Sequence, residues 1–463
     1  MNPRSAFTVL LLTLSCAAAP STAASAPAPA PCAPAPMGQA PPLTPTTAAT
    51  LKQAYECVFT RYAGGPTLDH RTLLTAAFAG FTQELQRRGE DRPDAMMPPL
   101  TGERARDWDA FSTVYQRILA TTSPAARQPL AAATMTAMVA ALHDNHAAWV
   151  REEAPMTAEQ GPPREFGTGI AGFSPPEGDP VGKGPLFVTM VTEGSPAARQ
   201  DLRPGDVVRA IDGASALTGG ILSRENAAKL IGDPRTKAPV RLTLHRPATR
   251  RTWTTAFTPT AYEGSPLGHA KLLKDGTAYV KLAGFLPGGE KKVFADLARL
   301  STGGRPRGLV LDLRGNGGGF PGTSVKLLSA FVHGATVGWA CDAKGACEPK
   351  RTDDTVPLLD LPLVVLTDRG CASACDAFSA AVKDLELGKL VGTRTAGIVS
   401  GPAGGFLLDD GSVLELPVKF GLGPDKEIVN TIGVPPDHHV ALTAQDLSRG
   451  RDPVLDKALT LLP

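Results

Sequence analysis

The sequence predicts a multidomain α/β protein, and three stretches of the chain support that prediction. Residues 44–160 hold amphipathic segments separated by proline and glycine, which indicates helices. Residues 164–260 hold short apolar runs around glycine turns, and residues 261–463 alternate strand-like and helix-like runs, which is typical of an α/β core. The 463 residues are enough for two or three domains. The helices expected in the first stretch are Leu51–Tyr62, Thr72–Arg88, Ala105–Leu119 and Pro129–Leu142.

The N-terminal residues have the pattern of an export signal. Arg4 supplies a positive charge, residues 6–14 are apolar and alanines follow, so residues 1–26 are expected to be a secretory signal peptide. The apolar run is too short for a helix that spans a membrane. A lipid anchor on Cys16 remains an alternative. Residues 27–43 are rich in alanine and proline, and they predict an extended, structureless linker. The protein is therefore expected to be secreted or otherwise extracytoplasmic.

The overall composition argues against several kinds of partner. The net charge is +2 and charged residues make up 20% of the chain, so nothing indicates the clustered basic face of a nucleic-acid-binding protein. The apolar share of 42% supports ordinary globular cores. We expect no metal and no cofactor, because the cysteines have no C-x-x-C spacing and no histidine beside them.

The cysteines suit an oxidising compartment. Apart from Cys16 there are six, which allow 15 pairings. Proximity in the sequence suggests a disulfide between Cys341 and Cys347. Cys371 and Cys375 lie one helical turn apart, a distance that a disulfide can bridge, and two buried thiols are an equal alternative. The six cysteines are Cys32, Cys57, Cys341, Cys347, Cys371 and Cys375.

A strand, a turn and a helix point to a reactive serine. Leu363–Thr367 reads as a buried strand, a turn with Gly370 follows, and Ser373 lies at the start of a helix that runs to about Asp384. A serine at this place projects from the sheet edge, beside the free N–H groups of the helix, which can stabilise an oxyanion. The alternative is an ordinary helix cap, since serine is a favoured N-cap residue.

A second segment, a strand that ends in a glycine-rich loop, supports the interpretation of Ser373 as a nucleophile. Residues 308–319 read GLVLDLRGNGGG, a buried strand that ends at Asp312 and is followed by three glycines. A phosphate-binding loop is disfavoured, because the Lys–Ser/Thr pair of such loops is missing. An N–H group of Gly317 or Gly318 can instead join the N–H group of Ala374 as two donors around one carbonyl oxygen.

Together the two segments resemble the tail-specific, or C-terminal processing, protease family. That family has a strand ending in D-L-R-x-N-x-G-G and then a serine in a run of small residues, and here Cys371–Asp376 supplies the run with Ser373 in the nucleophile position. The resemblance extends over roughly residues 50–450. It implies an N-terminal helical cap, a PDZ domain and a catalytic core of the ClpP/crotonase type over residues 261–463.

The resemblance also indicates which residue activates the serine. One branch of the family uses a lysine, but the lysine position holds Ile398, and Lys383 and Lys389 are expected on the surface. The other branch, similar to the tricorn core, uses a histidine after an amphipathic helix, in a run like L-x-D-G-H-T. Here that run is Leu142-His143-Asp144-Asn145-His146-Ala147, so His146 takes the position of the base.

The third catalytic position departs from the family pattern. The histidine branch orients its imidazole with a glutamate three residues before the glycine of a G-x-x-P-D run, and this position is Asn430. An asparagine oxygen can hold a histidine tautomer but cannot stabilise an imidazolium by charge, so a slower enzyme is expected. Glu427 is an alternative partner. A catalytically impaired member that binds peptides or lipids is the alternative function.

Residues 164–260 resemble a PDZ domain. The signals are the loop Gly167-Thr168-Gly169-Ile170, the run from Phe187 to Gly213 and the later strand VRLTLHR. The resemblance implies that a peptide C-terminus adds a strand and places its carboxylate on the loop N–H groups, with Gly167, Gly169 and Ile170 as contacts. The alternative is a scaffold whose groove is filled by the chain itself.

These observations predict a secreted serine peptidase. Ser373, His146 and Asn430 are its expected catalytic residues, and Ala374 with Gly317 or Gly318 forms the oxyanion site. Its expected partners are peptides or unfolded proteins, recognised by their C-termini, and no nucleic acid.

Overall fold

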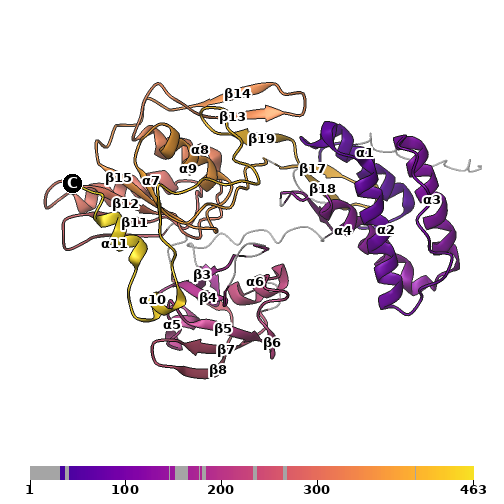
Figure 1. Ribbon diagram of the computed structural model, residues 1–463, viewed down its shortest axis with the longest axis horizontal. Coiled ribbons are helices and arrows are strands. Elements are labelled where there is room, and N and C mark those ends of the chain that lie inside the picture. Colours follow the sequence, from indigo (N-terminus) through magenta and orange to yellow (C-terminus); the bar gives the residue numbers. More distant parts are fainter. Residues whose placement is uncertain are drawn as a thin grey trace, which may run out of the picture.

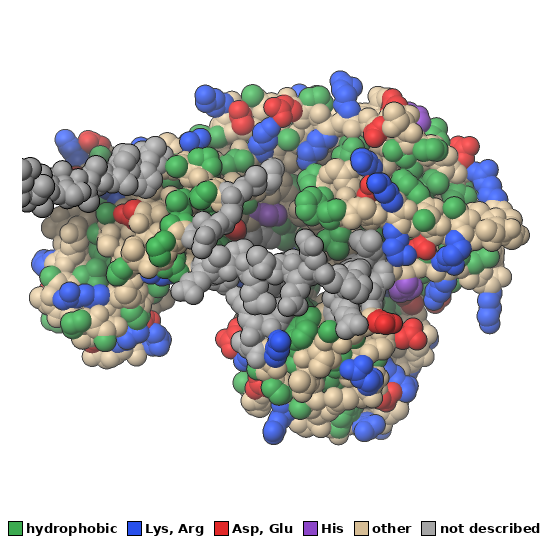
Figure 2. Space-filling model, turned by 180° about the vertical axis from the view of Figure 1, so that it is seen from behind, with side chains coloured by type: hydrophobic (Ala, Val, Ile, Leu, Met, Phe, Trp, Pro, Cys, Tyr) green, Lys and Arg blue, Asp and Glu red, His purple; other side chains and the backbone are tan. Residues whose placement is uncertain are grey.

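The computed structural model describes residues 32–36, 41–144, 146–151, 165–176, 178–179, 184–232, 237–263, 268–401 and 403–463. The expected signal peptide, and Cys16 with it, lies outside the described residues. Within the described ranges, no helix has both the length and the apolar character needed to cross a membrane. Basic and acidic side chains are both scattered over the face shown in Figure 2, in keeping with the small net charge.

Helices form the N-terminal part, at one end of the molecule (Figure 1). Their apolar faces bury Leu73, Phe81 and Tyr115 in a common core, which confirms the four helices expected from the sequence, with some ends shifted. The elements are α1 (Ala48–Arg61), η1 (Gly65–Thr67), α2 (His70–Arg87), α3 (Arg104–Thr121) and α4 (Pro124–Ala140).

A hairpin from the C-terminal part of the chain completes the helical core. Strand β17 (Ala403–Leu407) pairs with β18 (Val413–Pro417), and β1 (Ala148–Val150) pairs antiparallel with β18. Apolar residues of the hairpin, including Leu414, are buried in the same cluster as the helices. The chain that leaves α4 is thereby fixed against a segment that lies more than 200 residues later in the sequence.

Part of the alanine- and proline-rich segment packs on this hairpin, so the expectation of a structureless linker is wrong for residues 32–36. Cys32 is buried and forms a disulfide with Cys57 of α1. The Ala35 N–H group donates to the Gly405 carbonyl oxygen at 2.8 Å. A covalent bond and strand-like pairing therefore outweigh the composition that favours disorder.

The part expected to be a PDZ domain is built on a six-stranded sheet, in which five strands follow the order β3-β4-β5-β7-β8 and β6 pairs with β5. Helix α6 lies beside the edge strand β3. It contacts the core through an ion pair between Arg369 and Asp179, with 3.2 Å between Nη2 and Oδ1, and through α10 (Ala444–Ser448). Its elements are β2 (Glu165–Gly167), β3 (Ile170–Ser174), β4 (Phe187–Val191), α5 (Pro196–Arg199), β5 (Val207–Ile211), β6 (Ala214–Ser215), α6 (Arg224–Ile231), β7 (Val240–Arg246), β8 (Arg251–Phe257) and β9 (Thr260–Tyr262).

The C-terminal part is an α/β core on a six-stranded sheet in the order β10-β11-β12-β15-β16-β20. The strands are parallel apart from β10, which is antiparallel to β11. All residues of β12 and β15 are buried, because helices cover both faces of the sheet. The strands are β10 (His269–Leu272), β11 (Ala278–Lys281), β12 (Leu309–Asp312), β15 (Leu363–Thr367), β16 (Lys389–Gly392) and β20 (His438–His439).

Helices and a second small sheet surround this core (Figure 1). Helices α7 (Gly289–Leu300), α8 (Pro321–Ser329) and α9 (Ala374–Asp384) pack on one face, and α11 (Pro453–Leu459) packs on the other. A three-stranded sheet, in the order β14-β13-β19, lies beside α9. Its strands are β13 (Thr336–Asp342), β14 (Cys347–Arg351) and β19 (Lys419–Leu422), and the predicted disulfide Cys341–Cys347 joins the first two.

Candidate active site

Ser373 occupies the turn between β15 and α9, as the sequence predicts. Its backbone φ of 57° and ψ of −116° lie in a region that residues other than glycine rarely adopt, so the surrounding turn must hold it there. Cys371 and Cys375, on either side of the serine, form a disulfide. Of the two alternatives for this pair, a disulfide or two buried thiols, the structure therefore has the disulfide. Ser373 is the N-cap residue of α9 and forms a capping box with Asp376, as the alternative of a helix cap expected, and it also lines a cavity.

Asp376 fixes this turn to the loop that follows β16. One carboxylate oxygen accepts from the Ser373 N–H at 2.9 Å and the Ile398 N–H at 2.8 Å. The other accepts from the Gly397 N–H at 2.8 Å and from the Thr395 hydroxyl. Burial raises the pKa of Asp376, and these hydrogen bonds oppose that rise. No structural role was predicted for Asp376. Its place as the third residue of α9, three residues after the N-cap Ser373, was the signal that could have indicated a capping role.

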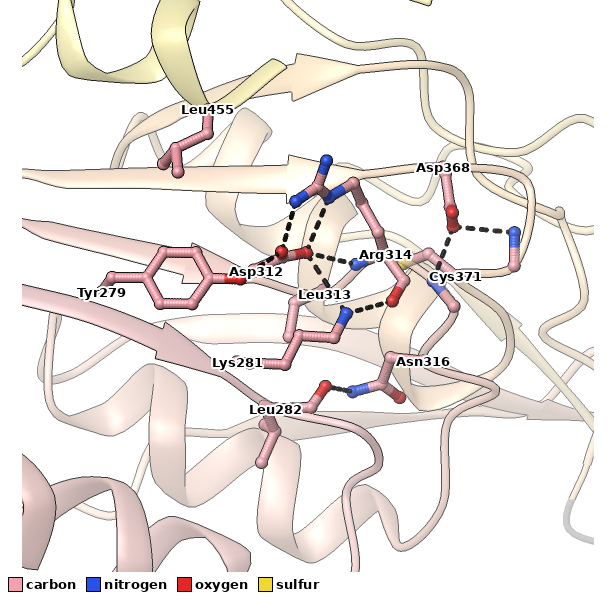
Figure 3. A network of polar contacts seen from close by, with 12 residues as sticks. Tyr279, Lys281, Leu282, Asp312, Leu313, Arg314, Asn316, Asp368, Cys371 and Leu455 are labelled. Atoms are coloured by element: carbon pink, nitrogen blue, oxygen red, sulfur yellow. Dashed lines mark hydrogen bonds and ion pairs between the residues drawn. The ribbon is translucent and has the colours of Figure 1, made fainter. Parts of the chain in front are cut away.

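A buried charged network holds the glycine loop that faces Ser373 (Figure 3). Asp312, at the end of β12, accepts from Tyr279 Oη at 2.7 Å and from Arg314 Nη2 at 2.6 Å. Lys281 Nζ lies 3.3 Å from Asp312, and Arg314 also pairs with Asp452 at 2.8 Å. Burial alone would raise the pKa of Asp312, but the charges of Arg314 and Lys281 outweigh it and hold that pKa far below its usual range.

Asn316 and Asp368 join the glycine loop to the serine turn. The Asn316 amide donates to the Leu282 carbonyl oxygen at 3.0 Å, and its main-chain oxygen accepts from the Ala372 N–H at 3.0 Å. Asp368 accepts from the N–H groups of Gly315 at 2.7 Å and Gly370 at 2.9 Å. The two segments that were paired on sequence grounds are therefore rigidly connected (Figure 3).

The candidate oxyanion donors differ in part from those expected. The Gly318 N–H already donates to the Asn316 side-chain oxygen at 2.9 Å, so Gly318 is not a free donor. Phe285 exchanges hydrogen bonds with Gly318 and Phe320, so the N–H of the intervening Gly319 points away from Phe285, and Gly319 lines the cavity with Ser373.

The other two expected oxyanion donors, Ala374 and Gly317, line two different cavities. Ala374 is the first residue of α9, where helix N–H groups lack intrahelical partners, and it lines the same cavity as Ser373. Gly317 lines a different cavity, on the side of the PDZ part. The arrangement therefore favours Ala374 with Gly319 as the pair of donors, and it corrects the expectation for Gly318.

His146 reaches the same cavity from the helical part. It lies between α4 and β1, and its Nδ1 atom is 3.2 Å from the Ser400 Oγ atom. The Ser400 hydroxyl donates to Asp144 Oδ1 at 2.7 Å, so it must accept from the imidazole. Asp144 Oδ1 also accepts from the His146 N–H at 3.0 Å and lies 4.0 Å from Nδ1. These contacts assign the proton to Nδ1 and leave Nε2 free to accept one.

Asn430 does not orient His146, which corrects the sequence expectation. Its Oδ1 atom accepts from the Val399 N–H at 3.0 Å, so Asn430 holds the loop that carries Ser400. No hydrogen bond joins Asn430 to His146 in the part of the chain that is described. Ser400 and Asp144 were not predicted as partners of His146, although Asp144 lies in the run that ends at His146-Ala147.

Glu427 also lies elsewhere, beside Asp384 at the end of α9. Burial, followed by a hydrogen bond with Asp384, raises the pKa of Glu427 to about 7. Two carboxyl groups form such a bond only when one of them carries a proton. Glu427, the alternative to Asn430, therefore lies in the loop that follows β19 and interacts with Asp384.

The raised pKa of Glu427 predicts a pH-dependent stability. The folded chain retains a proton that the unfolded chain releases above its ordinary pKa of 4.5. This contribution is complete below about pH 4.5 and is lost as the pH rises through about 7. The melting temperature of the wild-type protein should therefore fall relative to that of Glu427→Gln between pH 5 and pH 8, as measured by differential scanning fluorimetry. A constant difference between the two proteins over this range would contradict the assignment.

The PDZ loop is more closed than the sequence suggests. The Thr168 N–H donates to the Ile231 carbonyl oxygen at 2.8 Å, and the Ile170 N–H donates to the Thr168 hydroxyl at 3.1 Å. A Cβ atom on Gly167 would lie 2.4 Å from the Ile231 oxygen, and one on Gly169 would collide with Ser195. The glycines are thus required for packing. The N–H group of Ile170, one of the three residues expected to contact a carboxylate, is already used within the domain, as is that of the neighbouring Thr168.

The candidate active-site cavity has a volume of about 200 Å³. Ser373, Ala374, Gly319, His146 and Ser400 lie around it. Its far wall is apolar and comes from α8, α9, β13 and β19. The groups of an acyl-transfer site, a serine, an imidazole and free N–H donors, therefore meet at one cavity.

Comparisons with known proteins agree with this arrangement. Residues 276–440 match the model of peptidase family S41, and residues 187–244 match that of the PDZ domain. The chain is 28% identical over 259 residues to a carboxyl-terminal-processing protease of Picosynechococcus, covering 55% of this chain and 60% of that protein. It is 32% identical over 157 residues to the tricorn protease of Thermoplasma acidophilum, covering 34% of this chain and 14% of that protein.

The fold likeness extends over most of the chain. The solved structure of the photosystem II D1 C-terminal processing protease superposes with a TM-score of 0.55 at 22% identity, covering 90% of this chain and 97% of that one. The chain spans 50% to 60% of the length of the first four curated relatives.

Proposed function

We propose that this chain, which has an S41 peptidase domain over residues 276–440 and a PDZ domain over residues 187–244, is a serine peptidase that hydrolyses peptide bonds in polypeptide substrates. The observation that carries the proposal is the meeting of Ser373, His146 and the Ala374 N–H group at one cavity. The strained backbone of Ser373 supports it, because such strain is concentrated at functional sites.

The proposed reaction begins with proton transfer from Ser373 to Nε2 of His146. Oγ of Ser373 attacks the substrate carbonyl carbon, and the imidazolium later gives its proton to the leaving amine. The tetrahedral oxyanion lies between the N–H groups of Ala374 and Gly319. Water then hydrolyses the acyl-enzyme by the same route in reverse, with His146 again as the base.

Asp144 supplies the charge that Asn430 lacks. Its carboxylate holds the Ser400 hydroxyl, which in turn accepts from Nδ1 of His146. The carboxylate lies 4.0 Å from Nδ1, close enough to stabilise the imidazolium by charge. The alternative of a non-catalytic binding protein rested on the uncharged Asn430, and the contact with Asp144 supports the catalytic proposal instead.

We place the enzyme outside the cytoplasm and assign it extended substrates. The disulfides Cys32–Cys57, Cys341–Cys347 and Cys371–Cys375 support an oxidising compartment, as does the predicted signal peptide. Phe320 and Ile428 are 57% and 65% exposed next to cavity-lining residues, and they offer apolar contacts to an unfolded chain. Recognition of substrate C-termini by the PDZ domain is part of this proposal and requires the loop at Thr168 to open.

The proposal is tested by incubating the full chain with a denatured protein and identifying the fragments by mass spectrometry. New fragments are expected with the wild-type protein and not with Ser373→Ala, because the substitution removes the attacking oxygen. Equal fragment yields from the two proteins would show that any hydrolysis does not depend on Ser373. Folding of the variant is checked by its melting temperature.

A further inference from the structure

The active-site cavity contains one unexpected charged side chain. Most of its wall is apolar or glycine, from residues such as Leu328, Val337 and Ala377. Lys350 is the only lysine, arginine, aspartate or glutamate among the described residues that line it. Because a cavity of about 150 Å³ can hold a molecule the size of benzene, a cavity of this volume accepts about one substrate side chain. Lys350 therefore shares a small space with that side chain and with Ser373.

Lys350 has no acidic partner in the described part of the chain. It lies on β14, opposite Gly338 of β13, and is partly buried. The neighbouring Lys419 is paired with Glu348 at 2.6 Å, whereas Lys350 appears in none of the ion pairs. Burial, and then the charge of Lys419, lower the pKa of Lys350. An ammonium group in such a setting is unfavourable until an anion enters, which distinguishes it from an ordinary surface lysine.

We propose that Lys350 is a specificity-determining residue that pairs with a carboxylate of the substrate residue seated in the cavity. The carboxylate comes either from a glutamate or aspartate side chain or from the free C-terminus of the substrate. Both sources present the same planar anion, and the apolar wall contacts the carbon atoms that carry it. This inference rests on the proposed function and adds a class of preferred substrate to it.

The test compares peptides that differ only in whether they carry the carboxylate that Lys350 would bind. One series has Glu, Gln or Leu at a residue that flanks the cleaved bond, and a second series has a free or an amidated C-terminus. Wild-type protein should prefer the carboxylate member of at least one series. Lys350→Met should lower kcat/KM for that member by about 10-fold to 100-fold and leave its uncharged analogue nearly unchanged, as expected for a hydrogen bond to a charged group. The series that responds identifies the source of the carboxylate.

Lys419→Met is the matched control, because it removes a nearby lysine that is already paired and does not line the cavity. It should leave the preference for the carboxylate peptide unchanged. Lys350→Glu should reverse the preference and favour a lysine-containing peptide. The melting temperature and the rate of reaction with a fluorophosphonate probe establish that each variant is folded and retains an activated serine.

Two results would overturn the inference while leaving the proposed function intact. In the first, wild-type protein cleaves the peptides but Lys350→Met has the same ratio of kcat/KM for the Glu and Gln peptides and for the acid and amide peptides. In the second, Lys350→Met loses the probe reaction and the cleavage of every peptide, which would make Lys350 part of the proton transfer. Absence of both labelling and cleavage in the wild-type protein would instead overturn the proposed function, and this inference with it.

Discussion

Replacement of His146 by alanine is expected to lower kcat/KM by about 10⁴-fold to 10⁶-fold, as loss of the general base does in serine peptidases. In the structure His146 is linked to Asp144 through Ser400 and lines the same cavity as Ser373, from which we propose that its Nε2 atom takes a proton. The loss should fall on kcat rather than KM, because the imidazole acts in the transition state and not in substrate binding. Steady-state hydrolysis of a peptide that the wild-type protein cleaves measures the effect.

His143→Ala is the matched control. His143 is an exposed histidine one turn before His146 and does not line the cavity of Ser373. Its replacement should change kcat/KM by less than about 10-fold, within the range of surface substitutions. A similar loss in both variants, or near wild-type turnover by His146→Ala, would contradict the assignment of the base.

The same assay separates the two candidates for the orienting residue. Asp144→Asn keeps the size of the side chain but removes the charge near Nδ1 of His146, so kcat should fall. Asn430→Ala removes only the hydrogen bond to the Val399 N–H, so its effect on kcat should be the smaller of the two. The opposite order would restore Asn430 as the partner of His146.

Replacement of Asp312 by alanine is expected to lower the free energy of unfolding by about 3–5 kcal/mol. Asp312 is 2% exposed, and the side chains of Lys281 and Arg314 that it neutralises are 6% and 12% exposed. Removing the carboxylate leaves these cations buried with too little negative charge around them, and it releases the strand end that carries the glycine loop (Figure 3). Urea unfolding followed by circular dichroism measures the change.

Glu225→Ala is the control for this experiment. Glu225 forms an ion pair with Lys229 on α6 at 2.9 Å, but its side chain is 77% exposed. Solvent screens such a pair, so its loss should change the free energy of unfolding by less than about 1 kcal/mol. If Asp312→Ala is no more destabilising than Glu225→Ala, the buried network does not stabilise the core as described.

Local patterns were enough to single out Ser373 and His146, which the structure places at one cavity. The buried strand, glycine turn and helix start around Ser373 are contiguous in the sequence, and so are the helix α4 and the run that ends at His146. The glycine loop was also recognisable, because its strand end and its three glycines are local features. The structure brings these segments to one cavity, as the resemblance implied.

The partners of these residues could not be read from the sequence, because they depend on contacts between distant segments. Ser400 reaches His146 only because Asp376 and Asn430 hold the loop that follows β16. Whether the Gly318 or the Gly319 N–H is free depends on the Asn316 side chain and on Phe285. Lys350 gave no local signal, since an isolated lysine on a hairpin is normally a surface residue.

An activated serine in the folded full chain can be detected by its reaction with a fluorophosphonate probe, with the site of labelling located by mass spectrometry. The probe reports an activated serine without knowledge of the substrate. We expect one modified residue, Ser373, with no labelling of Ser373→Ala and very slow labelling of His146→Ala. Absence of labelling in the folded wild-type protein, or labelling that persists in Ser373→Ala, would contradict the claim that this chain is a serine peptidase acting through Ser373.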